Sequence, residues 1–187
     1  MAISQRNMTL EQFLKLPEKK PALEYERGVV KQKVSPKGPH SRLQFWLSYR
    51  FDSSDAPSKR AAAFPEARIT FGGRSLVPDV VVYRWDRIPR DPDGRVAEDF
   101  TTPSDIAVEI LSPGQSAAEY ERRCRWYVEH GIQVALLVSP RRESVKLFRS
   151  GQEPSVLTGD DLIDLAPALP GLRPTVRELF DALWLRE

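Results

Sequence analysis

Two short apolar segments of the sequence each carry a carboxylate in their interior. Residues 77–83 contain Asp79, and residues 105–111 contain Glu109. Both segments are rich in β-branched side chains, which predicts buried strands. A carboxylate that loses its water costs several kcal/mol or more unless a partner compensates for it, so Asp and Glu are seldom buried alone. Two such strands in one small chain indicate a shared partner for the acids, and a divalent cation is the simplest one.

The pleat of a strand decides which face each acid occupies. Side chains alternate between faces, so Asp79 shares its face with Val81 and Tyr83, while Glu109 shares its face with Ala107. Either acid alone would be structural or solvent-exposed more often than functional. Because apolar residues flank both acids, we interpret them together as a functional pair.

Composition limits the classes of protein to which the chain can belong. Its 187 residues, 41% hydrophobic and 29% charged, predict a single soluble globular domain over residues 1–187. A net charge of +2 does not by itself indicate a nucleic-acid-binding protein. Cys124 is the only cysteine, which excludes an intrachain disulfide and a cysteine zinc site and fits a reducing cytoplasm. Without a secretory signal pattern or a bilayer-spanning apolar run, the sequence predicts a cytoplasmic protein and no membrane contact.

Capping signals and hydrophobic periodicity give the order of the elements that must position the acids. Helices are predicted to begin with capping boxes at Thr9 and Ser116, and further helices to begin near His40 and near Thr175. A hairpin is predicted over residues 23–34, a long loop over residues 84–103, and further strands over residues 61–64, 67–71, 133–139, 144–149 and 153–157. This order predicts the α/β (α+β) class, with a central mixed β-sheet flanked by helices.

Three further side chains are candidates for chemistry, and each has a simpler alternative. Glu24 lies on the first strand of the predicted hairpin, where an ordinary edge-strand charge is the alternative. His40 lies on the first turn of the second predicted helix, where a lone histidine is more often a hydrogen-bonding core or surface residue. Arg123 follows Glu119 by four residues on the third predicted helix, so these two side chains can simply pair along its flank.

Short motifs run along nearly the whole chain. They are Met8-Thr9-Leu10-Glu11-Gln12-Phe13, Leu23-Glu24-Tyr25 with Gly28, His40, Phe64-Pro65-Glu66, Val77-Pro78-Asp79-Val80, Val108-Glu109-Ile110-Leu111-Ser112-Pro113, Tyr127 with His130-Gly131-Ile132, and Leu169-Pro170-Gly171-Leu172. Each motif alone is weak. In their order and spacing, from about Thr9 to Phe180, the chain resembles the Uma-two family of restriction-endonuclease-like proteins, within the PD-(D/E)XK nuclease superfamily.

This resemblance implies a restriction-endonuclease-like fold and a metal-dependent endonuclease that hydrolyses DNA phosphodiester bonds. It implies that Asp79 and Glu109 are Mg²⁺ (or Mn²⁺) ligands at an opened edge of the sheet, with Glu24 as a further ligand or water contact. Hard cations of this kind prefer carboxylate oxygens and water. His40 can orient a water molecule or contact a phosphate. DNA is the expected partner, and the sequence leaves open a homodimer, which nucleases that cut both strands often form.

One position departs from the superfamily pattern. The resemblance implies a lysine two residues after Glu109, and this position is Leu111. Family members commonly carry the lysine on the next helix instead, four residues before a tyrosine, and counting back from Tyr127 gives Arg123. A guanidinium can stabilise phosphate charge, and Arg123 is therefore the candidate for this role, but it does not easily lose a proton to act as a base.

The departure leaves two other functions open beside the nuclease. One is a catalytically impaired nuclease fold that acts as a non-enzymatic nucleic-acid-binding or scaffold protein. The other is glycoside cleavage by the two acids, which we rank last because the sequence offers no sugar-stacking aromatic platform.

Overall fold

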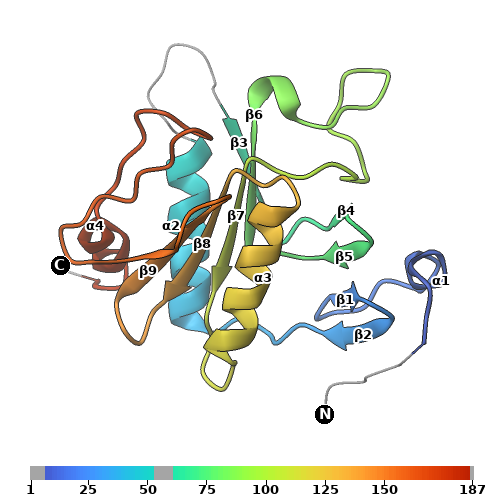
Figure 1. Cartoon of the computed structure of the whole chain (residues 1–187), viewed down its shortest axis with the longest axis horizontal. Helices are drawn as coiled ribbons and strands as arrows, with labels where there is room; N and C mark the ends of the chain where they lie inside the picture. Colours follow the sequence, from blue (N-terminus) through green and yellow to red (C-terminus); the bar gives the residue numbers. More distant parts are fainter. Residues whose placement is uncertain (1–6, 53–60, 186–187) are drawn as a thin grey trace.

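The computed structural model describes residues 7–52 and 61–185 of the chain (Figure 1). Its helices are α1 (Leu10–Leu14), α2 (Gly38–Asp52), α3 (Ala117–Glu129) and α4 (Val176–Asp181), with a 3-10 helix η1 (Trp85–Arg87). Its strands are β1 (Leu23–Glu26), β2 (Val29–Gln32), β3 (Ala61–Pro65), β4 (Ile69–Phe71), β5 (Arg74–Leu76), β6 (Val80–Arg84), β7 (Ile106–Ile110), β8 (Val134–Ser139), β9 (Ser144–Arg149) and β10 (Ser155–Thr158). None of the helices within these ranges is long and apolar enough to cross a lipid bilayer.

The larger sheet contains six strands in the order β10-β9-β8-β7-β6-β3. β7 and β8 run parallel and are joined through α3, whereas the other neighbouring strands of this sheet are antiparallel. α2 and α4 pack on one face, and α3 packs on the other (Figure 1). The predicted mixed sheet flanked by helices is therefore confirmed.

A second, antiparallel sheet has the strand order β2-β1-β5-β4. The sequence predicted one continuous strand over residues 77–83, and this was wrong at its start. The chain leaves the smaller sheet at Leu76 and enters the larger one at Val80. Pro78 has no N–H to offer to a strand ladder, which gives a physical reason for the break. Asp79 therefore lies at the junction of the two sheets, where its N–H still donates to the Val108 carbonyl oxygen at 3.0 Å.

Alternation along β6 and β7 divides the core into two layers. Val80, Val82 and Val108 face α2 and α4, whereas Val81 and Ala107 face α3. Because helices cover both faces, a side chain on either side of these central strands is removed from water. A carboxylate at this position must find its compensating partners within the protein.

The start of α3 differs from the prediction in one detail. The Ser116 hydroxyl accepts a hydrogen bond from the Glu119 N–H, as an N-cap residue does. The reciprocal half of the predicted capping box does not form, because the Glu119 carboxylate accepts a hydrogen bond from the Lys31 ammonium at 2.6 Å. The predicted capping box at Thr9 is complete.

Asp105 is a second fully buried acid, directly before β7 and at the opposite end of this strand from Glu109. Its carboxylate accepts hydrogen bonds from the Arg84 N–H at 2.8 Å, the Gln133 side-chain amide at 3.0 Å and the Arg87 guanidinium. These bonds fasten the long loop after β6 to the starts of β7 and β8. Asp105 is thus a structural acid with its partners in place.

We expect Asp105→Ala to lower the free energy of unfolding by roughly 3 kcal/mol, because it leaves buried donors and the Arg87 guanidinium without their acceptor. Urea denaturation followed by circular dichroism measures this change. Asp93→Ala, at an exposed turn of the same loop, is the matched control and should leave the midpoint nearly unchanged. An Asp105→Ala protein as stable as the wild type would contradict the structural role.

Candidate active site

Three carboxylates from different elements meet where the two sheets join. Glu24 comes from β1, Asp79 from the link between β5 and β6, and Glu109 from β7; they are 5%, 2% and 0% exposed. Backbone donors fix two of them: the Val77 N–H donates to Glu24 Oε1 at 2.9 Å, and the Ile110 N–H donates to Asp79 Oδ2 at 2.6 Å. These acids, with the side chains that contact them, are called the acid cluster below.

Arg123 of α3 joins two members of the acid cluster. Its guanidinium donates to both oxygens of Glu24, at 3.0 Å from Nη1 and 2.7 Å from Nη2, and Nη1 also lies 3.3 Å from Glu109 Oε1. The guanidinium carbon lies 5.1 Å from the centre of the Tyr120 ring. The simple pairing of Arg123 with Glu119 along the helix is therefore wrong, since Glu119 pairs with Lys31 of the hairpin.

Lys33 is the basic residue of the acid cluster that the sequence did not single out. Its ammonium donates to Asp79 Oδ1 at 2.8 Å, and its side chain is only 8% exposed. Lys33 follows β2 directly, and its N–H donates to the Ala22 carbonyl oxygen, which extends the hairpin by one pair. Strand periodicity could have indicated Lys33. Side chains alternate along a strand, so Lys33 lies on the same face of the hairpin as Lys31, which is paired with Glu24.

His40, Gln44 and Tyr127 complete the surroundings of Asp79 and Glu109. His40 Nε2 lies 3.3 Å from Asp79 Oδ1, and its Nδ1 lies 3.1 Å from the Ser112 hydroxyl. Gln44, one turn further along α2, donates to the Asp79 carbonyl oxygen at 2.8 Å. The Tyr127 hydroxyl donates to Glu109 Oε1 at 2.7 Å. Tyr127 entered the sequence prediction only as the motif residue from which Arg123 was located, because a motif does not report the partner of a hydroxyl.

Burial and charge shift the acids in opposite directions. Burial raises the pKa of Glu109 to about 7, although Arg123 opposes the shift, and the negative charge of Asp79 adds to it. Burial would also raise the pKa of Asp79, but His40 and the Lys33 ammonium outweigh it and hold this pKa below its usual value. The two central acids, Asp79 and Glu109, therefore differ in protonation state near neutral pH. Such a difference is typical of acid–base pairs in active sites.

The same balance keeps both basic side chains charged. Burial alone would lower the pKa of Lys33, but Asp79, Glu109 and Glu24 raise it above its usual value. Burial likewise opposes the charge of Arg123, and Glu24 and Glu109 raise its pKa well above the usual value. The acid cluster thus holds two permanent cations against its carboxylates.

The donor set fits a hard divalent cation held by two carboxylates and water. Glu109 Oε2 is buried and has no hydrogen-bond partner among the described residues, so this oxygen is available as a ligand. Within residues 7–52 and 61–185, no group of three or more His, Cys, Asp or Glu side chains has metal-binding geometry. A cation such as Mg²⁺ keeps several of its waters and needs only one or two carboxylates from the protein.

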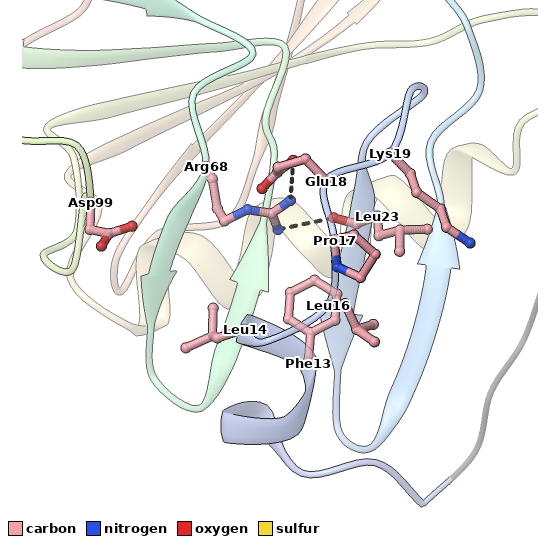
Figure 2. Close-up of a pocket in the computed structure, with 9 residues that line it drawn as sticks. All are labelled: Phe13, Leu14, Leu16, Pro17, Glu18, Lys19, Leu23, Arg68 and Asp99. Atoms are coloured by element: carbon pink, nitrogen blue, oxygen red, sulfur yellow. Dashed lines mark hydrogen bonds and ion pairs between the residues drawn. The ribbon is translucent and has the colours of Figure 1, made fainter.

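A separate hollow lies between α1, the following segment and the smaller sheet (Figure 2). It is lined by Phe13, Leu14, Leu16, Pro17, Glu18, Lys19, Leu23, Arg68 and Asp99. The Arg68 guanidinium at its wall donates to the Leu23 carbonyl oxygen at 3.0 Å and lies 3.9 Å from Glu18 Oε2. None of the three clustered acids lines this hollow, so it is distinct from the candidate active site.

All five residues that the sequence singled out meet in one place. Glu24, Asp79, Glu109, Arg123 and His40 belong to the acid cluster, and Glu24 is a buried member rather than an ordinary edge charge. Together with the mixed sheet and its flanking helices, this arrangement belongs to the class of restriction-endonuclease-like nuclease folds.

Comparison with known proteins agrees with this class. Residues 10–177 match the model of the Uma2 family, described as "Putative restriction endonuclease", and the chain belongs to this family. A crystal structure of a "putative nuclease belonging to DUF820" from Anabaena variabilis ATCC 29413 is similar, with a TM-score of 0.87 and 38% sequence identity. The similarity covers 95% of this chain and 99% of that one. No curated protein matches the chain.

We expect Arg123→Ala to lower the free energy of unfolding by about 3–5 kcal/mol, because it leaves Glu24 and Glu109 buried without their cation. A residue that only paired along the helix surface would cost a few tenths of a kcal/mol. Arg125→Ala, on the same helix with a side chain 45% exposed, is the matched control and should cost little. Equal, small losses for both variants in urea denaturation would contradict the role of Arg123.

The raised pKa of Glu109 predicts a pH dependence of stability in metal-free buffer. A carboxyl whose pKa rises from about 4.3 in the unfolded chain to about 7 in the folded protein binds protons more tightly when folded. The folded state therefore loses stability as the pH rises between these two values, by a few kcal/mol from this group. Glu109→Gln removes the titration, so the difference between wild type and variant should change over this pH range.

The measurement is urea denaturation of both proteins from pH 4.5 to 8 in EDTA. Groups remote from the acid cluster titrate alike in both proteins, so their contributions cancel in the difference. Parallel stability curves for wild type and Glu109→Gln would mean that Glu109 ionises normally.

Proposed function

We propose that the chain is a metal-dependent endonuclease that hydrolyses phosphodiester bonds of DNA. The observation that carries this proposal is the burial of Glu24, Asp79 and Glu109 in one charge-compensated cluster. Stability alone does not explain such a cluster, since apolar residues of similar volume often replace buried ion pairs at no cost. Active sites are where buried acids with separated pKa values gather. Membership of a family described as restriction endonucleases supports the same function.

In this proposal Asp79 and Glu109 hold Mg²⁺ (or Mn²⁺), and Glu24 is a further ligand or a contact to bound water. When bound, such an ion activates water and neutralises charge that builds on the phosphate. The chain prepares the ligands beforehand. Tyr127 and Arg123 hold Glu109 Oε1, which leaves Oε2 free to bind, while a backbone N–H fixes one oxygen of Asp79.

The remaining cluster residues have supporting roles. Arg123 keeps Glu24 and Glu109 together and adds positive charge beside them. His40 lies against Asp79 at the start of α2, from where its imidazole can orient a water molecule or contact a phosphate. DNA is the proposed substrate, and a homodimer that acts on both strands remains part of the proposal.

A second candidate function is a non-enzymatic nucleic-acid-binding or scaffold protein. The observation that favours it is Leu111, which packs with the apolar residues on the α3 side of the sheet. The strand that bears Glu109 therefore offers an apolar side chain where the superfamily pattern has a lysine. Cleavage assays separate the two functions.

We expect the wild type to cleave plasmid DNA in Mg²⁺ or Mn²⁺ and to lose this activity in EDTA. Asp79→Asn and Glu109→Gln should each lower the single-turnover rate by about a thousandfold, because each removes a charge that holds the cation. Mg²⁺ should raise the melting temperature of the wild type but not of these variants, since ligand binding stabilises only the state that binds.

Glu119→Gln is the matched control, because its carboxylate lies on α3 but pairs with Lys31 outside the cluster. It should cleave at the wild-type rate. A wild type that binds Mg²⁺ through Asp79 and cuts neither duplex nor single-stranded DNA would support the scaffold instead. A wild type that neither binds the ion nor cuts would overturn the metal site as well.

A further inference from the structure

We propose that Lys33 is a further catalytic residue, whose ammonium contacts a non-bridging oxygen of the scissile phosphate. This inference rests on the proposed function and assigns the phosphate-binding cation of that site. In hydrolysis, the oxygen of a water bonds to phosphorus and the bond to one ester oxygen breaks. The departing oxygen keeps the electron pair and takes a proton, and the attacking water loses one to solvent. Lys33 keeps its proton throughout and balances the charge that gathers on the phosphate oxygens.

The position of the Lys33 ammonium is the first argument. It lies 2.8 Å from Asp79 Oδ1, beside the acid at the junction of the two sheets. Glu66 Oε1, at 3.9 Å, is beyond hydrogen-bond distance, so among the described residues Asp79 is the one hydrogen-bond acceptor of the ammonium. An ammonium has three donors. Two of them therefore remain for a phosphate that approaches Asp79.

The engagement of Arg123 is the second argument. Both terminal nitrogens of its guanidinium are already bonded, Nη2 to Glu24 and Nη1 to Glu24 and Glu109. Turning these donors to a phosphate would leave two buried carboxylates without a cation, at a cost of several kcal/mol. Arg123 is thus a positioning residue that holds the acids, and the contact to phosphate falls to a different cation.

Two other nearby side chains, Leu111 and Lys31, do not supply this cation. Leu111 is apolar, and Lys31 is turned to Glu119, with a side chain 45% exposed. The Lys33 side chain, in contrast, is 8% exposed, and its ammonium contacts the buried Asp79 carboxylate. An ammonium in a partly desolvated site acts on a phosphate more strongly than one in open water, because the effective dielectric constant there is lower.

Cleavage is the first test. Lys33→Gln should lower the single-turnover rate on plasmid DNA by a hundredfold or more, the usual effect of losing one electrostatic stabiliser. Lys33→Arg keeps the charge and should stay within about tenfold of the wild type. Lys31→Gln, two residues away on the same hairpin face, is the matched control and should leave the rate unchanged.

DNA binding without metal is the second test, and it does not depend on activity. Asp79→Asn should suppress cleavage, and it removes the carboxylate that holds the ammonium. In EDTA, the logarithm of the binding constant for a labelled DNA duplex should fall with the logarithm of salt concentration. Adding Lys33→Gln to this variant should make the slope shallower by about 0.9, the value for one phosphate contact. Adding Lys31→Gln should not change it. The double variant removes both members of a buried pair, so it avoids the uncompensated charge that endangers folding of Lys33→Gln alone.

The outcomes separate this inference from the proposed function. Wild-type cleavage that survives Lys33→Gln within threefold overturns the role of Lys33 and leaves the nuclease standing. If the wild type does not cut, the proposed function fails, and the salt slope alone decides whether Lys33 meets a phosphate. An unchanged slope would disprove the contact between Lys33 and a phosphate, whether or not the wild type cuts DNA. A loss of stability with unchanged slope and rate identifies Lys33 as a purely structural partner of Asp79.

Discussion

The compensation of buried negative charge is the constraint on which this structure depends. Glu24, Asp79 and Glu109 are all removed from water, and each would cost several kcal/mol without a partner. Lys33 and Arg123 supply the positive charge, and backbone N–H groups hold one oxygen each of Glu24 and Asp79. Neither cation comes from the strand that carries Glu109. The acid at the centre of the larger sheet therefore forces the hairpin and α3 to converge on it.

This convergence explains the arrangement of the two sheets. The smaller sheet contributes Glu24 and, one residue beyond β2, Lys33, so the hairpin must stay against the end of β7. The break between β5 and β6 frees the Val77 N–H for Glu24 and turns the Asp79 side chain toward Ile110. In a continuous strand through this point, the Val77 N–H would have bonded to a neighbouring strand instead. The irregular backbone at the junction thus binds the acid cluster together.

The sequence predicted those parts of the site that local patterns encode. Asp79 and Glu109 stood out because charge interrupts an apolar run. The helices followed from capping residues and hydrophobic periodicity, which in α2 corresponds to the buried side chains of Leu43, Leu47 and Phe51. Lys33 and the true partner of Arg123 escaped prediction because they depend on contacts between distant segments. Lys33 and Asp79 are 46 residues apart in the chain, and Arg123 and Glu24 are 99 apart. Local spacing favoured Glu119 for Arg123, but a deeply buried carboxylate competes better for a guanidinium than an exposed one, since water already solvates the latter.

The two positively charged groups, a guanidinium and an ammonium, are suited to different positions in the acid cluster. A guanidinium presents a rigid fork that can satisfy a carboxylate bidentately, which suits Arg123 to holding Glu24 while it also reaches Glu109. An ammonium is a compact point charge on a flexible stem, and it can release one acceptor and take another with little rearrangement. Lys33 occupies the position beside Asp79 where such exchange is useful. The site therefore keeps positive charge although position 111 is a leucine. The hairpin supplies an ammonium and α3 supplies a guanidinium.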